Sequence, residues 1–230
     1  MALNIVNEID GAVAIRRVLI SVSDKTGLDK FVPALVKACP KVTIYSTGGT
    51  YTAIANILGE KAAKKHLVAV SDYTGQPEMQ GGLVKTLDFK IYLGLLSETY
   101  NAAHKKDLAR IGAKPIDMVV VNLYPFRETV AQDGVTPEMA RTNIDIGGPC
   151  MVRASAKNYL RVCSVTDPRD YKKLVKELEE ANGTISLKTR LYLMKKAFMH
   201  TALYDAAIAA YFSEQVTYAK LVKTYPTIHD

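Results

Sequence analysis

The feature that most constrains the fold of this chain is a local pattern that occurs twice near its start. Residues 17–22 (RVLISV) form a short apolar run typical of a buried strand. A polar turn at 23–27 interrupts it, and apolar residues then recur at helical spacing over 28–36. The second copy has its apolar run at 42–45 and a glycine-rich turn at 46–50, again followed by a helical stretch. Strands that alternate with helices in this way predict βαβ units and a parallel sheet.

The rest of the chain continues this alternation. Residues 118–121 (MVVV) form the clearest further strand. We also expect strands at 67–70 and 162–165, and helices at 105–110, 171–180 and 187–212, the last capped by Ser186. Ser23 or Asp24 is expected to cap the first helix. Residues 61–66 are expected to form a short basic insertion, and residues 71–90 are expected to form a long functional loop.

These elements predict one α/β domain, a parallel sheet flanked by helices, with a helical C-terminal part. We expect an N-terminal extension over residues 1–15, the domain over 16–212 and a C-terminal tail over 213–230.

Composition narrows the possible partners of this domain. The 230 residues carry a net charge of +7, which favours an anionic partner such as a nucleotide or phosphate ester. A nucleic-acid partner is not expected, since no basic stripe with interleaved aromatic residues occurs. The three cysteines and four histidines lack metal-ligand spacing, so we expect no metal and a reduced, cytoplasmic setting. No secretory signal or membrane-spanning run is evident, and no membrane association is expected.

The polar turns mark a candidate ligand site. In an open parallel sheet, ligands bind at the carboxyl ends of the strands. Each polar turn of this chain lies at such an end and precedes a helix, whose free N–H groups attract an anion. Together the turns predict a monophosphate site, formed by Ser21, Ser23, Lys25, Thr26, Thr47, Gly48, Gly49 and Thr50. Neither a Walker loop nor a GxGxxG motif is present. The same residues would also serve as ordinary helix caps and turn formers, and for either turn alone that is the commoner role.

Further candidates follow the later strands and lie in the long loop. Asn122 and Tyr124 come just after the strand at 118–121, and Asp145 opens a tight turn that continues with Ile146 and Gly147. Lys85, Thr86 and Lys157 supply polar and cationic groups elsewhere. Each of these residues alone could be an ordinary solvated lysine or turn residue. The evidence for a ligand site therefore comes from their joint pattern.

That joint pattern resembles the IMP cyclohydrolase domain of the bifunctional purine-biosynthesis proteins, which also carry an AICAR formyltransferase domain. The match runs in order over residues 17–212. The shared motifs are 19–27 (LISVSDKTG), 46–50 (STGGT), 70–75 (VSDYTG), 77–79 (PEM), 84–87 (VKTL), 121–126 (VNLYPF), 143–148 (NIDIGG), 153–158 (RASAKN), 200–202 (HTA) and 204–209 (YDAAIA).

The resemblance implies a methylglyoxal synthase-like fold and an enzyme that closes the purine ring of 5-formamido-AICAR ribotide to IMP with loss of water. It implies no cofactor, a homodimer, and a possible separate AICAR formyltransferase that supplies the substrate. Carried over by motif, Lys85, Tyr124, Asp145 and Lys157 would be catalytic. Substrate binding would fall to Ser21, Ser23, Lys25, Thr26, Thr47, Gly48, Gly49, Thr50, Thr86, Asn122, Ile146 and Gly147.

The chain departs from the family's pattern in the long loop. Where the family usually has arginine, histidine and proline around the VKTL motif, this chain has Leu83, Asp88 and Phe89, and Tyr92 replaces a second histidine. Loss of an arginine removes a cation and a fork-shaped donor. A non-catalytic purine-nucleotide-sensing module of the same fold is therefore the alternative, and IMP binding without turnover would distinguish it from the enzyme.

Overall fold

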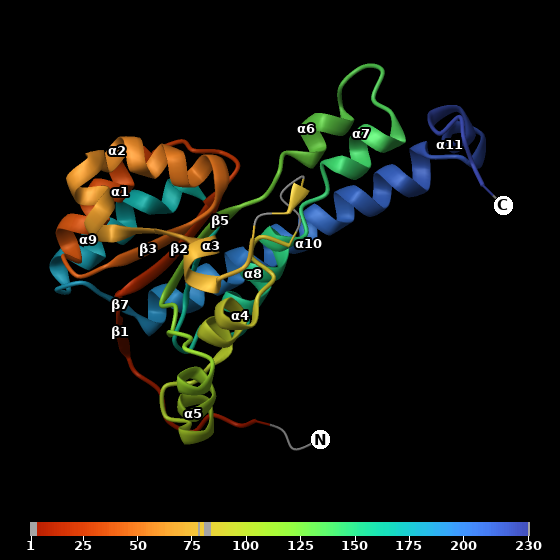
Figure 1. The fold of residues 1–230 in the computed structure, drawn as a ribbon. Coiled ribbons are helices and arrows are strands. Elements are labelled where there is room, and N and C mark those ends of the chain that lie inside the picture. The colour runs from red at the N-terminus through yellow and green to blue at the C-terminus, as the bar shows by residue number, and fades with distance from the viewer. Residues whose placement is uncertain (1–3, 78, 81–83, 230) are drawn as a thin grey trace.

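The computed structural model describes residues 4–77, 79–80 and 84–229, and its centre is a five-stranded parallel sheet (Figure 1). The sheet has the order β4-β3-β2-β5-β6, and every neighbouring pair is parallel. Its strands are β2 (Arg17–Val22), β3 (Thr43–Ser46), β4 (Leu67–Ala69), β5 (Met118–Asn122) and β6 (Cys163–Val165). The predicted α/β class and parallel sheet are confirmed.

Helices cover both faces of the sheet because successive strand residues point to opposite sides. On β2, Val18 and Ile20 pack into a core with α1 (Leu28–Ala38), α2 (Gly48–His66) and α9 (Tyr171–Glu180). Leu19 packs into a second core with α4 (Phe89–Leu96), α8 (Gly147–Lys157) and α10 (Leu187–Gln215). All of these central strand residues are nearly fully buried, as an apolar run between two helical layers requires.

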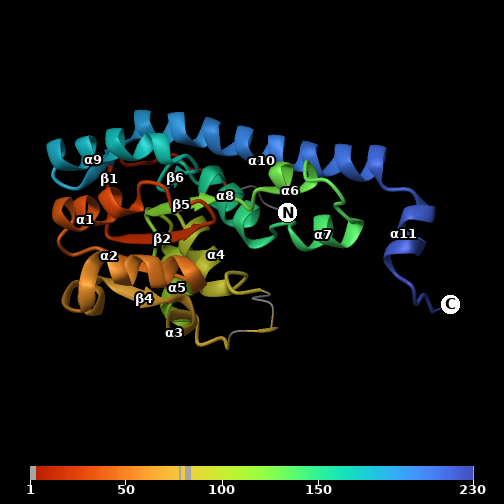
Figure 2. The same cartoon turned by 90° about the horizontal axis from the view of Figure 1, so that it is seen from above.

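The helix α10 is 29 residues long, about 43 Å, and extends beyond the sheet (Figure 2). Its distal half lies beside α6 (Phe126–Val130) and α7 (Pro137–Thr142), and α11 (Tyr218–Thr224) follows it. Smaller elements complete the chain: α3 (Val70–Thr74), α5 (Ala102–Arg110) and the 3₁₀ turn Pro168–Asp170. Within the described part of the chain, no helix is long and apolar enough to cross a membrane.

The expected N-terminal extension takes part in the fold. Within it, β1 (Ala12–Ala14) pairs antiparallel with β7 (Thr184–Ser186). The guanidinium of Arg190, fully buried, donates to the carbonyl of Asp10 at 2.7 Å and to three further carbonyls. Because these contacts satisfy polar groups far apart in sequence, the segment before residue 16 is anchored at least from Asp10 onward.

Several local predictions are corrected. The first helix is not capped by Ser23 or Asp24: it starts after Gly27, which has φ 77°, and Asp24 instead accepts a hydrogen bond from the N–H of Thr26. The expected basic insertion at 61–66 belongs to α2, which is kinked at Gly59. The loop expected over 71–90 holds most of α3 and the start of α4. By contrast, the Ser186 cap on α10 is confirmed, since its hydroxyl accepts from the N–H of Thr189.

Candidate functional site

A cavity of about 600 Å³ lies at the carboxyl ends of β2, β3 and β5, where the polar turns were predicted to meet. Fourteen of the sixteen predicted site residues line it: Ser21, Ser23, Lys25, Thr47, Gly48, Gly49, Thr50, Lys85, Thr86, Asn122, Tyr124, Asp145, Ile146 and Gly147. These residues come from segments more than a hundred positions apart, so the sheet topology is what gathers them.

One wall of the cavity is the N-terminus of α2, where two lysine side chains converge. A Cβ built on Gly48 would lie 3.6 Å from Nζ of Lys85, and one built on Gly49 would lie 4.0 Å from Nζ of Lys25. Gly48 also has φ 48°, a conformation that glycine adopts without strain. The free N–H groups of a helix start and two ammonium groups together form an anion-binding wall.

The N-terminus of α8 also lines the cavity, and it carries a carboxylate. Oδ1 of Asp145 accepts a hydrogen bond from the N–H of Gly148 at 2.8 Å and so caps the helix. Burial raises the pKa of Asp145, while hydrogen bonds from the backbone N–H groups of Gly148 and Tyr124 act in the opposite direction. A partly buried carboxylate with a raised pKa in a cavity is a candidate for proton transfer.

Glycines allow the close contacts on this wall. A Cβ on Gly148 would lie 2.4 Å from Oδ2 of Asp145, and one on Gly147 would lie 2.6 Å from Oγ1 of Thr86. Both distances are shorter than side chains tolerate, so Gly147 and Gly148 leave the space that Thr86 and Asp145 occupy. The segment 85–86 therefore reaches the starts of both helices, with Lys85 near α2 and Thr86 against α8.

Two of the predicted binding residues have their polar groups engaged by the protein itself. The hydroxyl of Thr50 donates to the carbonyl of Val22 and accepts from its N–H, which links α2 to the end of β2. The side-chain amide of Asn122 accepts from the N–H of Asp24 and donates to its carbonyl, both at 2.8 Å. These hydrogen bonds hold the 23–25 turn against the cavity.

Thr26 and Lys157 do not line the cavity. Thr26 is exposed on the turn before α1. Lys157 is exposed at the C-terminal end of α8, about 15 Å along the helix axis from Gly147. The family motif implied a place for Lys157 in the site, but Lys157 and Gly147 lie at opposite ends of the eleven-residue helix α8.

Several further residues that were not predicted also line the cavity: Val22, Val84, Leu87, Thr142, Ile144, Gly148 and Met151. The spacing of Gly147, Gly148 and Met151 on α8 is the signal that could have indicated the last two, since residues four apart share a helix face. The apolar residues Leu87 and Ile144 carry no chemical signal that sequence reasoning recognises.

The departures from the family's loop have separate local roles. Asp88 caps α4 by accepting from the N–H of Lys90 at 2.7 Å, and Phe89 is 87% exposed at the start of that helix. The hydroxyl of Tyr92 is buried and has no hydrogen-bond partner within the described residues. Leu83, like Glu78 of the PEM motif, lies outside the described residues.

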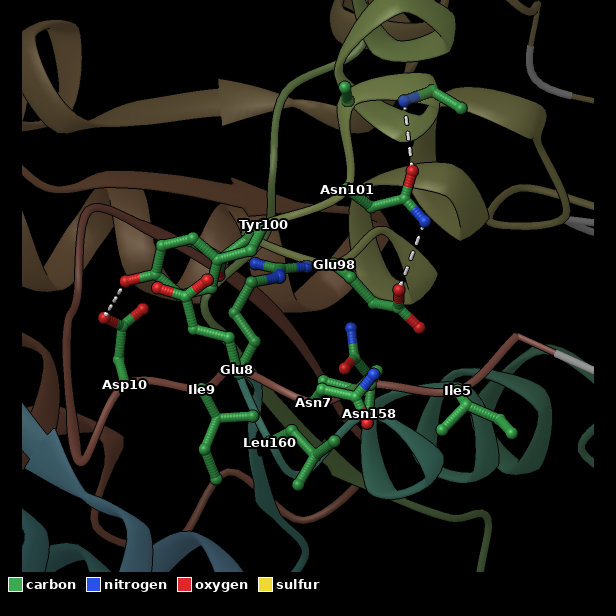
Figure 3. A pocket seen from close by; sticks show the side chains of 15 residues that line it. Ile5, Asn7, Glu8, Ile9, Asp10, Glu98, Tyr100, Asn101, Asn158 and Leu160 are labelled. Atoms are coloured by element: carbon green, nitrogen blue, oxygen red, sulfur yellow. Dashed lines mark hydrogen bonds between the residues drawn. The ribbon is translucent and has the colours of Figure 1, made fainter.

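A second cavity, of about 460 Å³, lies between the N-terminal segment and the start of α5 (Figure 3). Its side chains include Glu8, Asp10 and Glu98, and the hydroxyl of Tyr100 donates to Asp10 at 2.7 Å. Asn101 donates to Glu98 at 3.3 Å. Three carboxylates against one cation, Arg161, disfavour an anion in this cavity, whereas Lys25 and Lys85 make the cavity between α2 and α8 the candidate site for an anionic ligand.

Comparison with known proteins identifies the domain. Residues 27–150, more than half of the chain, match the family model for the MGS-like domain. The chain belongs to the MGS-like domain family. Residues 155–229 match the model for the AICARFT/IMPCHase bienzyme.

Curated relatives extend the match along the chain. The chain is 46% identical over 200 residues to the bifunctional purine biosynthesis protein PurH of Ruminiclostridium cellulolyticum and 50% identical over 198 residues to that of Anaeromyxobacter dehalogenans. These alignments cover 87% and 86% of this chain, but only 37% and 36% of the relatives. The predicted resemblance to the bifunctional purine-biosynthesis proteins is confirmed for that portion of their length.

A solved structure, described as the crystal structure of ForH, has the same fold. It superposes with a TM-score of 0.75 at 31% identity, covering 86% of this chain and 97% of the other. The fold of this chain is therefore shared with a solved structure of similar extent.

Proposed function

We propose that this MGS-like domain is an IMP cyclohydrolase of purine biosynthesis, which closes the ring of 5-formamido-AICAR ribotide to IMP and releases water. The observation that carries the proposal is the distribution of charge in the cavity lining, which has two lysines at the start of α2 and a partly buried carboxylate at the start of α8. A substrate with a phosphate at one end and an uncharged reacting end matches this arrangement. The relatives' name, bifunctional purine biosynthesis protein, supports the same pathway.

We propose that the 5′-phosphate binds at the start of α2. Its charge would be met by Lys25 and by the free N–H groups of Gly48 and Gly49, with Thr47 as a further donor. The glycines matter because a side chain at either position would lie between the phosphate and the backbone N–H groups. The net charge of +7 adds general attraction for a nucleotide.

Ring closure requires the carboxamide nitrogen to attack the formyl carbon. The carboxamide nitrogen loses a proton, and the formyl oxygen gains negative charge and takes up a proton to become a hydroxyl. The formamido nitrogen then loses its proton as the ring C=N bond forms, and the hydroxyl takes up this second proton and leaves as water. Asp145, ionised, would accept the proton from nitrogen. The ammonium of Lys85 and the N–H groups at the start of α8 would stabilise the charge on oxygen. Tyr124 would orient the reacting end, and the reaction is intramolecular, so positioning itself supplies much of the rate.

The test is conversion of 5-formamido-AICAR ribotide to IMP, followed by absorbance and chromatography. The purified protein is expected to form IMP, and Lys85→Ala to lower kcat at least about tenfold, the scale of one lost charge-stabilising donor. If Lys85→Ala raises KM alone, Lys85 belongs to the phosphate end of the cavity, near Gly48. Tight IMP binding without turnover would contradict the proposal and favour the nucleotide-sensing module.

The homodimer and the catalytic role of Lys157 form a linked part of the proposal. Since Lys157 is exposed and about 15 Å along α8 from Gly147, it would serve a cavity only if a second copy brought it there. Mixing Lys85→Ala with Lys157→Ala protein tests this arrangement. Activity that neither variant has alone would support it, whereas an unchanged kcat for Lys157→Ala would remove this lysine from the mechanism.

The remaining expectations follow from the same proposed pathway. The formylated substrate would come from an AICAR formyltransferase on a separate chain or segment, and the reaction itself needs no redox or metal chemistry. The site would then be that of a cytoplasmic enzyme without nucleic-acid or membrane partners.

A further inference from the structure

Tyr204 lies outside the cavity, yet its hydroxyl contacts the backbone on both sides of Ile144 in the turn that carries Asp145. It accepts a hydrogen bond from the N–H of Asp145 at 2.7 Å and donates one to the carbonyl of Asn143 at 3.2 Å. The side chain belongs to α10 and is 9% exposed. A hydroxyl that both accepts and donates to the same short turn restricts the turn more than either bond alone.

The carboxylate of Asp145 depends on that turn. Oδ1 reaches the N–H of Gly148 only while residues 143–145 approach α8 from their present direction. Burial raises the pKa of Tyr204, so its hydroxyl stays protonated and available as a donor across the neutral range. The hydrogen bond to the N–H of Asp145 also satisfies a partly buried backbone donor that would otherwise be costly.

We infer that Tyr204 is a positioning residue, whose hydroxyl fixes the backbone of Asn143 and Asp145 and thereby aims the carboxylate of Asp145 into the cavity. Tyr204 is not among the residues that line the cavity, so it would have no direct contact with a ligand bound there. The effect of Tyr204 on catalysis rests on the proposed function. Its two hydrogen bonds to the turn do not, because they are present in the protein without any ligand.

Tyr211 provides a matched control on the same helix. The rings of Tyr204 and Tyr211 both meet Phe126 edge-to-face, with centroids 6.2 and 6.0 Å away. Tyr211 is 2% exposed, and its hydroxyl has no hydrogen-bond partner within the described residues. Replacement of either tyrosine by phenylalanine keeps the ring packing, but only Tyr204→Phe removes contacts with the turn.

Hydrogen exchange tests the hold on the turn directly. In Tyr204→Phe, the amide of Asp145 is expected to exchange about tenfold faster, since one neutral hydrogen bond contributes up to roughly that factor. In Tyr211→Phe, its exchange is expected to stay at the wild-type rate. Equal exchange in Tyr204→Phe, Tyr211→Phe and the wild type would overturn the inference, whether or not the protein turns over any substrate.

Kinetics test the consequence for catalysis. Tyr204→Phe is expected to lower kcat for IMP formation about tenfold at nearly unchanged KM, because the phosphate end of the cavity is untouched. Tyr211→Phe is expected to retain the wild-type kcat. Faster exchange with unchanged kcat would overturn the catalytic part, and absence of turnover in the wild type would refute the proposed function while exchange still decides the role of Tyr204.

Discussion

Gly148→Ala tests most sharply whether the close packing around Asp145 matters for function. The added methyl would lie 2.4 Å from Oδ2 of Asp145 and 2.7 Å from Cδ2 of Leu123. The first distance is about 1 Å short of ordinary van der Waals contact, so the carboxylate must move by roughly that amount. Gly148 is buried between these two groups, and the backbone on either side is fixed by α8.

A shift of this size has a large expected effect on rate and a small one on stability. Misplacement of a catalytic group by about 1 Å costs roughly a hundredfold in rate. The overlap would cost about 1–3 kcal/mol of unfolding free energy, but alanine in place of glycine in a helix returns up to about 1 kcal/mol. We therefore expect kcat to fall about a hundredfold while the protein stays folded.

The assay is kcat for IMP formation, together with thermal unfolding of the same preparations. Gly11→Ala is the matched control, since a Cβ there meets nothing within 4 Å, and it is expected to leave both quantities unchanged. A Gly148→Ala protein whose kcat lies within about threefold of wild type would refute the reasoning, because the carboxylate could then move without consequence.

Three further predictions concern charge. Activity that needs ionised Asp145 is lost as pH falls through its raised pKa. The acid limb of kcat/KM, which reports the ligand-free protein, should therefore lie above the ordinary aspartate value of about 3.9 and vanish in Asp145→Asn. Ionising this partly buried carboxylate costs stability, so wild type should also lose unfolding free energy relative to Asp145→Asn as pH rises through that pKa. Lys25→Ala should raise KM about tenfold with kcat little changed, and a fall in kcat at unchanged KM would contradict a phosphate-binding role. Arg190→Met should lower the unfolding free energy by about 3 kcal/mol or more in denaturant titration, because four carbonyls lose a charged donor. Arg190→Lys should restore only part of this free energy, since an ammonium lacks the planar guanidinium geometry, and full restoration would contradict the importance of that geometry.

The sheet could be predicted because its signals are local. The apolar runs at 17–22 and 118–121 form strands that are buried on both faces. A continuous apolar run is the pattern that a strand between two helical layers requires. The polar turns after the strands then meet because parallel strands place all their carboxyl ends on one edge. Most of the cavity follows from these two facts, without knowledge of side-chain geometry.

The errors came from positions where tertiary contacts or a single glycine decided the structure. Gly59 suggests an end to α2, but the chain resumes the helix after a kink, so 61–66 is helical. The pairing of β1 depends on β7 and on Arg190, which are more than 160 residues away in sequence. Lys157 was expected in the site from its family motif, and it lies at the far end of α8 from Gly147, so only a second copy would bring it to a cavity.

The distribution of charge in the cavity also fixes which way a nucleotide would enter. Both α2 and α8 point their N-termini at the cavity, so backbone dipoles alone would allow an anion at either wall. Asp145 caps α8 and, once ionised, repels a phosphate there, whereas Lys25 and Lys85 stand at α2. A phosphate would thus be directed to α2 and the uncharged end of the ligand to the carboxylate, which is the orientation that the proposed ring closure would require. Asp145→Lys would remove this asymmetry, and it should weaken the preference for one binding orientation even where overall affinity for a nucleotide rises.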